Sequence, residues 1–138
     1  MAIQYSGTLR DNQLDQIEAT TGVSAKFRLY SGAAPANCAA VATGTLLVDM
    51  ALPSDWMNAA SGGTKTLLGT WSGTGTAGAG TGTAAGYFRV LDSTGTTTHV
   101  QGTVTITGSG GDLTVDNPSI ANAQVVTINA FTITALNA

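Results

Sequence analysis

The chain has 138 residues, of which 9% are Asp, Glu, Lys or Arg, whereas a typical soluble domain carries about 25%. Its five basic and eight acidic side chains give a formal net charge of -3, and the basic ones are scattered, which argues against nucleic-acid binding because that needs clustered Lys and Arg. One His and one Cys cannot supply a zinc site, and so few ionisable groups make an enzyme a poor expectation.

The length supports one domain with one core, and we expect residues 1–138 to form a single β-sandwich domain with residues 1–22 as an N-terminal arm and helix. The first six residues lack the cationic flank and apolar run of a secretory signal. No later apolar run approaches the ~20 residues that span a bilayer. A soluble protein made in the cytoplasm, without membrane contact, is therefore expected.

A helix is predicted over Thr8 to Thr21, with Thr8 as its cap and Gly22 as its stop. Its apolar stripe is narrow, because only Leu14 and Ile17 lie three residues apart on one face. Such a helix is expected to lie across a sheet edge or to reach a neighbouring molecule.

Alternation of apolar and polar residues with a period of two begins after Ser24 and recurs along the chain. It predicts strands over residues 25–30, 46–52, 64–71, 87–91, 96–107, 112–116 and 124–136. A short helical turn over 54–58 is expected between two of them. About eight short strands predict an all-β fold, a two-sheet antiparallel sandwich that is jelly-roll-like and carries one short N-terminal helix.

The last predicted strand changes phase, since Val126 and Ile128 have one parity while Phe131 and Ile133 have the other. A β-bulge near Asn129, or a strand that bends from one sheet into its partner, would let both pairs reach the core. The second arrangement is favoured.

The stretch between Ser72 and Gly86 is of low complexity and is predicted to be a mobile surface loop, because glycine weakens a strand. The alternative is a Thr-alternating edge strand that forms against a partner. Its glycines at 73, 75 and 78 mimic a dinucleotide-binding motif, but residues 79–86 cannot form the helix that this motif requires. We expect no nucleotide there.

Few other side chains could carry chemistry. His99 lies on the polar face of a predicted strand without a paired carboxylate, so an exposed or interface histidine is expected. Cys38 is expected to pack as a small apolar group. Asp112 and Asp116 could touch a calcium ion, but their spacing matches no known loop and capping of turns explains them as well. No catalytic residue, metal or cofactor is predicted.

The whole chain nevertheless resembles a known family. The segments that carry the resemblance are MAIQYS, FRLYSGAAPANCAA, GTLLVDMALPSDWM, GYFRVLDSTGTTTHVQGTVT, GGDLTVDN and VVTINAFTIT. Together they are similar to small virion proteins of tailed phages, and most closely to capsid cement (decoration) proteins such as that of a Bordetella phage. The resemblance implies a jelly-roll domain that pairs as a homodimer on the outer surface of an icosahedral shell and clamps neighbouring major capsid subunits.

Contacts to the capsid or to a second copy are expected from Tyr5, Leu14 and Ile17 near the N-terminus. Trp56 and Met57 are also expected to make such contacts, and the alternative for these two residues is burial in the core. Two other functions stay open. A carbohydrate-binding sandwich would expose Trp56, Trp71 or Tyr87 as a platform, and a small tail or fibre component would be present in few copies.

Overall fold

The computed structural model describes residues 3–135. Its elements, in chain order, are α1 (Gly7–Thr21), β1 (Lys26–Ser31), β2 (Leu46–Ala51), β3 (Thr64–Thr66), β4 (Trp71–Thr74), the 3-10 turn η1 (Ala77–Ala79), β5 (Thr83–Leu91), β6 (Thr98–Ile106), β7 (Leu113–Val115), β8 (Ser119–Ile120), β9 (Val125–Ile128) and β10 (Thr132–Thr134). The fold of these residues is therefore mostly β with a single α-helix, as predicted.

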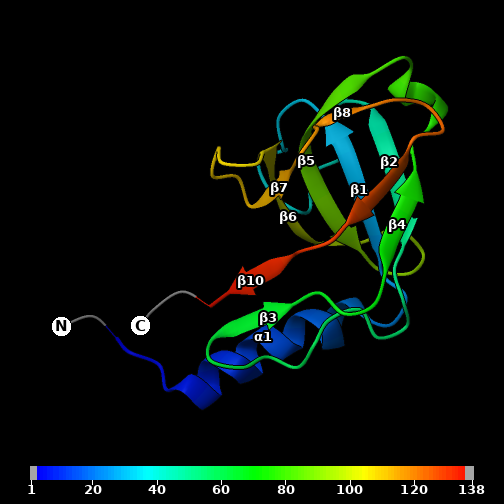
Figure 1. Cartoon of the computed structure of the whole chain (residues 1–138). Coiled ribbons are helices and arrows are strands. Elements are labelled where there is room, and N and C mark those ends of the chain that lie inside the picture. Colours follow the sequence, from blue (N-terminus) through cyan, green and yellow to red (C-terminus); the bar gives the residue numbers. More distant parts are fainter. Residues whose placement is uncertain (1–2, 136–138) are drawn as a thin grey trace.

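The largest sheet has the strand order β2-β1-β5-β6-β7, with β8 paired to the start of β5. Two ribbons complete the structure, β4 with β9 and β10 with β3 (Figure 1). All pairs are antiparallel except β6 with β7, which are parallel. The prediction of a wholly antiparallel arrangement is wrong at that pair, where the glycine-rich turn after Ile106 leads the chain back alongside β6.

The core lies between the large sheet and the ribbon of β4 and β9, and its centre is aromatic. The alternation predicted for β1 is confirmed, because Ala25, Phe27 and Leu29 are fully buried. The Phe27 ring stacks on Phe88 with centroids 5.2 Å apart and lies 5.4 Å from the Trp71 ring. Aromatic pairs at such distances stabilise beyond the area that they bury.

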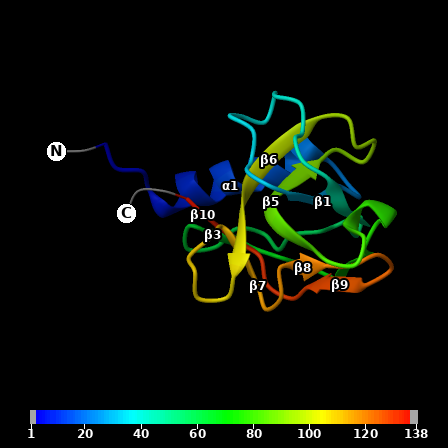
Figure 2. The same cartoon turned by 90° about the horizontal axis from the view of Figure 1, so that it is seen from above.

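Helix α1 begins one residue earlier than expected, because its cap is Ser6 and not Thr8. The Ser6 hydroxyl accepts a hydrogen bond from the Leu9 amide at 3.2 Å. Gly22 ends the helix as predicted, with a φ of +89° that favours glycine, and its amide donates to the Glu18 carbonyl. Figure 2 shows α1, β3 and β10 projecting together to one side of the large sheet.

The segment of low complexity is not the predicted mobile loop. It contains β4, η1 and the start of β5, so the alternative of an edge strand is closer, with the chain's own β9 as partner. Thr76 ties it to β2, since its amide donates to Leu47 and its hydroxyl to Leu46. Gly75 permits the close approach to residue 121, because a Cβ there would lie 2.0 Å from the Ala121 carbonyl oxygen.

Two further predictions differ from the structure between residues 54 and 71. Residues 54–58 form bends and an isolated bridge in place of a helical turn, and the single strand over 64–71 is divided into β3 and β4. The Trp56 carbonyl and the Leu68 amide are hydrogen-bonded at 2.9 Å, so this stretch folds back on itself between the two strands.

The bent C-terminal strand is confirmed. β9 pairs with β4 and β10 pairs with β3, so the chain passes from one ribbon to the other between Ile128 and Thr132. Ile128 and Phe131 are both 4% exposed, and the change of phase brings both into the core.

Candidate interaction surfaces

Helix α1 is held to residues 56–65 by carboxylates, and we call this contact the helix clasp. Asp11 accepts from the Gly63 amide at 2.7 Å, and Asp15 accepts from the Ala60 amide at 2.8 Å. Glu18 accepts from the amides of residues 56 and 57, at 2.9 and 3.1 Å. The three acids are spaced by four and three residues, so they share one face of the helix.

Lys65 completes the helix clasp from β3. Its side chain is only 2% exposed, and its Nζ lies 2.8 Å from Asp15 Oδ1, 3.3 Å from Glu18 Oε2 and 2.9 Å from the Asn58 carbonyl. A buried ammonium needs such partners because it has lost its water. The hydrogen bond from Lys65, and after it the one from the Ala60 amide, lowers the pKa of Asp15.

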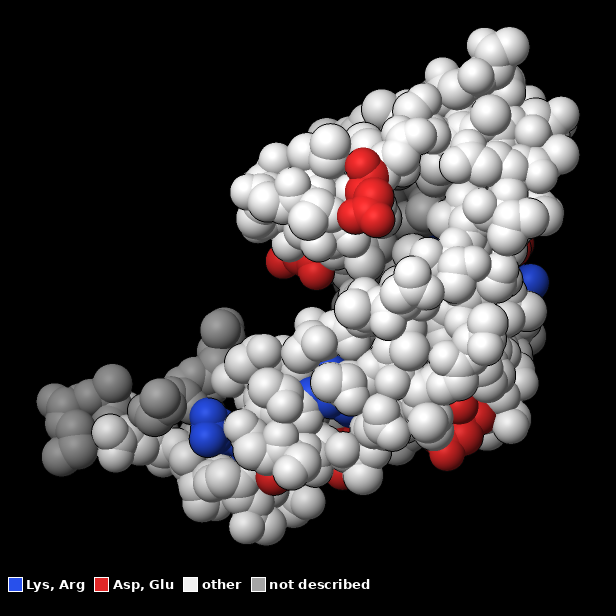
Figure 3. Space-filling view, viewed as in Figure 1, with Lys and Arg blue, Asp and Glu red and all other residues white. Residues whose placement is uncertain are grey.

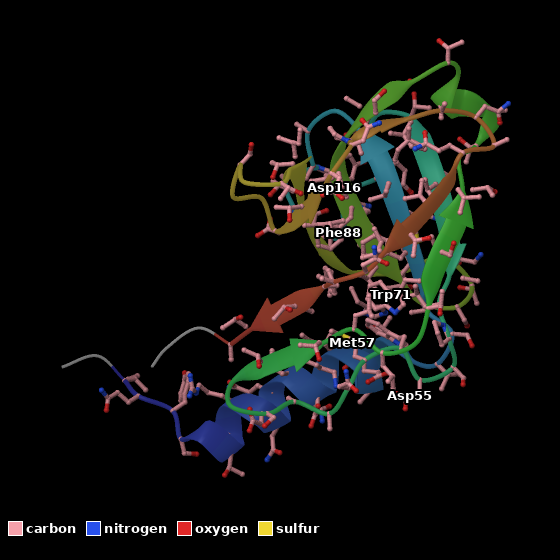
Figure 4. All side chains as sticks on the ribbon, in the orientation of Figure 1. Asp55, Met57, Trp71, Phe88 and Asp116 are labelled. Atoms are coloured by element: carbon pink, nitrogen blue, oxygen red, sulfur yellow. The ribbon has the colours of Figure 1, made fainter. Side chains whose placement is uncertain are left out.

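The helix clasp changes the roles expected for four of the predicted contact residues. Trp56 is fully buried, Met57 is 2% exposed and Leu14 is 4% exposed, while Ile17 is half-buried against the core. The Trp56 indole also donates to the Gly22 carbonyl at 3.0 Å. The side chains of Trp56, Met57 and Leu14 are therefore covered in this conformation and are not exposed for contact with a partner, and Figure 4 places Met57 close to α1.

Tyr5 is the predicted contact residue that the structure leaves accessible. It lies in the segment Ile3 to Ser6, which precedes α1 and has no regular secondary structure, and which we call the N-terminal arm. Tyr5 is 42% exposed and Ile3 is 77% exposed, and Leu9 in the first turn of α1 is 44% exposed. Large apolar side chains at such exposure form a candidate contact surface.

A second held segment is the Ala-rich loop between β1 and β2. The Tyr87 ring stacks on Tyr30 with centroids 5.0 Å apart, and its hydroxyl donates to the Thr43 carbonyl and accepts from the Thr43 amide. Arg89 is 3% exposed and donates to the carbonyl of Ala40 at 2.9 Å and to Gln101 Oε1 at 3.0 Å. Sequence patterns gave no sign of this role, because Arg89 contacts the loop only after β1 and β5 have paired.

The aromatic platform of a carbohydrate-binding domain is not formed by the residues proposed for it. Trp56, Trp71 and Tyr87 are each fully buried. A sugar would require these rings at the surface, where they could stack against it.

The outer face of the large sheet carries a small ion cluster. Arg28 Nη2 lies 3.0 Å from Asp49 Oδ2, and Lys26 Nζ lies 3.7 Å from Asp49 Oδ1. Burial lowers the pKa of Arg28, but the pairing with Asp49 outweighs burial and raises it above the ordinary value. Figure 3 shows a face of the molecule on which a few separate acidic and basic side chains lie among many uncharged residues.

Of the polar residues considered for chemistry, the two acids Asp112 and Asp116 form hydrogen bonds within the fold. The Thr103 amide and hydroxyl both donate to Asp112 at 2.8 Å and lower its pKa, while Asp116 accepts from the Thr107 hydroxyl at 3.0 Å. The two acids thus join β6 and the residue that follows it to the two ends of β7, which differs from the capping of turns expected for them. His99 and Cys38 are both half-buried. Residues 3–135 contain no group of three or more His, Cys, Asp or Glu arranged to hold a metal ion.

A groove runs along the open side of the fold, and we call it the seam groove. One wall is the stretch 112–117, which contains β7, and the other is the stretch 125–134, which contains β9 and β10. It consists of two successive hollows of about 430 and 380 Å³. Figure 3 shows a hollow between the upper part of the molecule, which contains the large sheet, and the lower part, which contains α1 and β3. Figure 4 places Asp116 on the upper side.

Comparison of the chain with known proteins finds no family model, no curated protein and no solved structure that matches it. In the part of the chain that the structure describes, α1 is too short and too polar to cross a membrane, and no other helix could do so.

Proposed function

We propose that the chain is a cement (decoration) protein that binds the outside of an icosahedral phage capsid and clamps neighbouring major capsid subunits. The proposal rests on the sequence resemblance described above and on the surface of the molecule. In it, the large sheet and the ribbon of β4 and β9 are the two layers of a jelly-roll-like sandwich, and a second copy is the partner in a homodimer.

The observation that carries the proposal is the way the chain uses its charges. Basic side chains are used in internal contacts, among them those of Lys26, Arg28, Lys65 and Arg89. Most of the acids are used in the same way, by the helix clasp and by the strand caps. The exterior that remains consists largely of Thr, Ser, Ala and Gly, which are hydrated without charge.

A surface of this kind suits a protein that is present in many copies side by side. Neighbouring copies with little charge repel one another weakly, even at close spacing. Each copy that binds only the assembled shell stabilises it by RT ln(1 + [L]/Kd), and many such terms add over a shell. Internal ties at the helix clasp and at the loop between β1 and β2 keep the binding surface rigid, which lowers the entropic cost of binding.

Contacts are proposed at the N-terminal arm and the adjoining first turn of α1, where Tyr5 and Leu9 are exposed. A stable interface needs about 1,000 Å² or more, so these residues would form part of a larger patch.

The experiment that tests the proposal adds the purified chain to capsid shells assembled without it and measures bound copies by sedimentation. The wild-type chain is expected to bind saturably and to raise the temperature at which the shell disrupts. The double variant Tyr5→Ala/Leu9→Ala should bind at least about tenfold more weakly, because it loses two apolar contacts. Val41→Ala is the matched control, since Val41 is 86% exposed on the loop between β1 and β2. Equal binding by all three proteins would argue against the proposed contact surface, and no binding by any would overturn the function.

A further inference from the structure

Two arginines lie side by side on the outer face of the large sheet. Arg28 on β1 and Arg89 on β5 are directly opposite each other in the antiparallel pairing of these strands, so their side chains are on the same face. Like charges in directly opposite positions destabilise a sheet. The next partners in this row are Asp49 on β2 and the uncharged Gln101 on β6. One carboxylate therefore accompanies two guanidinium groups.

That carboxylate is used by only one of the two arginines. Asp49 pairs with Arg28 and also lies 3.7 Å from Lys26 Nζ. Among residues 3–135, no carboxylate oxygen lies within 4.0 Å of a nitrogen of Arg89. Arg89 is 3% exposed and donates to uncharged oxygens, which include the Ala40 carbonyl at 2.9 Å. The three cations and one anion of this face give a local charge of +2, although the chain carries a formal net charge of -3.

Both arginines line a hollow of about 590 Å³, which we call the arginine hollow. One wall is formed by residues 38–42 of the Ala-rich loop, and the other by residues 95–98. Asp92 lies near the second wall, but its carboxylate accepts hydrogen bonds from the Thr94 hydroxyl and the Thr96 amide and does not line the hollow. In the part of the chain that the structure describes, the hollow thus has two cations and no acid in its lining.

The guanidinium groups keep hydrogen-bond donors that the fold does not use. An arginine carries five N–H groups. Arg28 donates to the Gly95 carbonyl at 3.2 Å and to Asp49 at 3.0 Å, and its side chain is 19% exposed. The Nε–H groups of Arg28 and Arg89 are buried without an acceptor. Because a buried cation is costly without an anion, an anion in the hollow would be stabilised by both arginines.

The rest of the lining indicates which kind of anion fits. Beside the arginines it contains small or apolar side chains, among them Ala39, Val41, Ala42 and Leu91. Such a lining favours an anion that carries a hydrocarbon part, which an inorganic ion such as phosphate lacks. Carboxylates match the planar guanidinium group and form strong, charge-assisted hydrogen bonds with it. The arginine hollow therefore suits an organic carboxylate.

We propose that the arginine hollow binds an organic carboxylate, with the charged group held by Arg28 and Arg89 and the hydrocarbon part against the Ala-rich loop. This inference goes beyond the capsid function and does not depend on it. Two sources supply this chemistry, a free small carboxylate and an acidic side chain of a bound protein, and the experiments below separate them.

Titration with sodium butyrate, followed by NMR of the backbone amides, tests the site. At constant ionic strength, butyrate should cause saturable shifts in residues 38–42 and 95–98, whereas sodium chloride and sodium phosphate should not. Arg89 also holds the loop, so the test variant is Ala39→Glu, which adds a carboxylate at an exposed position in the wall of the hollow. It should weaken butyrate binding at least about tenfold, because the added carboxylate competes for the arginines.

Ala36→Glu is the matched control for this variant. It makes the same substitution at an exposed position of the same loop, outside the arginine hollow, and should bind butyrate as the wild type does. The proposal would be overturned by the lack of saturable shifts with butyrate, by equal shifts with phosphate, or by equal butyrate affinity of the two variants.

Sedimentation with capsid shells identifies the source of the carboxylate. If the ligand is an acidic side chain of a capsid subunit, Ala39→Glu should bind shells at least about tenfold more weakly than Ala36→Glu. Equal shell binding by the two variants would assign the site to a free small carboxylate. A chain that binds no shell at all would overturn the capsid function and leave the butyrate result standing, so the two failures are distinguishable.

Discussion

Lys65 Nζ and Asp15 Oδ1 lie 2.8 Å apart, although the lysine side chain is 2% exposed and the aspartate side chain is 42% exposed. The pair thus joins a charge inside the molecule to one at its surface. It also joins β3 to α1 across 50 residues of sequence. Because α1 buries few apolar side chains, this pair and the neighbouring carboxylates hold the helix in place.

Replacing Lys65 by Met should therefore loosen α1. The variant leaves Asp15 and Glu18 without their cation, and since both keep contact with water we expect a loss of about 1–3 kcal/mol in the free energy of unfolding. Urea denaturation measures it. Lys26→Met is the matched control, because that lysine is partly exposed and its pairing should contribute less than about 1 kcal/mol. Equal effects of the two substitutions would show that the helix clasp does not depend on Lys65.

Acid should destabilise the chain through its aspartates. The Thr96 amide and the Thr94 hydroxyl lower the pKa of Asp92 to about 2, and the pKa values of Asp15 and Asp112 are lowered as well. A carboxylate with a folded pKa below its unfolded value of about 3.9 contributes stability that is complete above that value and is lost as the pH falls through the folded pKa. The urea concentration at the midpoint of unfolding should therefore decrease as the pH is lowered from about 4 to about 2.

Asp92→Asn should make that fall shallower, because the amide does not titrate. A carboxyl-carbon NMR titration that finds Asp92 at its ordinary pKa near 3.8 would contradict this expectation.

Gly75→Ala should destabilise the fold through close contact. The added methyl would meet the Ala121 carbonyl oxygen at 2.0 Å, and because that oxygen belongs to the backbone, the chain must shift to make room. We expect a cost of about 2–3 kcal/mol, measured by thermal unfolding. Gly7→Ala is the control, since nothing lies within 4 Å of its Cβ and alanine favours the helix. A Gly75→Ala protein with wild-type stability would show that β4 and residue 121 separate easily.

Tyr87→Phe should free the loop between β1 and β2. Its hydroxyl is hydrogen-bonded to both the amide and the carbonyl of Thr43, and its removal should cost about 1 kcal/mol. Hydrogen exchange by mass spectrometry should show faster exchange in residues 40–45 and unchanged exchange in β6. Uniform acceleration across the chain would instead indicate a general loss of stability.

The parts of the fold that follow from local patterns were predicted from the sequence. The alternation around Phe27 gave β1, and the change of parity between Ile128 and Phe131 gave the passage from one ribbon to the other. Gly22 gave the end of the helix. In each case neighbours along the chain determine the structure, so the pattern is visible without knowledge of the fold.

Features that depend on distant partners were not predicted. The glycine-rich stretch that begins within β4 appears flexible in the sequence, but β4 is fixed by β9, about 54 residues further along the chain. Lys65 is flanked by two threonines and appears to be a surface residue until α1 covers it. The acids at 11, 15 and 18 could have indicated the helix clasp, because their spacing places them on one face of the helix. Three carboxylates on one face favour a contact with backbone amides or basic side chains elsewhere in the chain.

The most direct test of the account is the number of copies of this chain on each capsid shell, together with the temperature at which the shell disrupts. We predict saturable binding over the whole shell surface, in a fixed ratio to the major capsid subunit, and a higher disruption temperature than that of the bare shell. A few copies confined to a tail, or full binding that leaves the disruption temperature unchanged, would contradict the account.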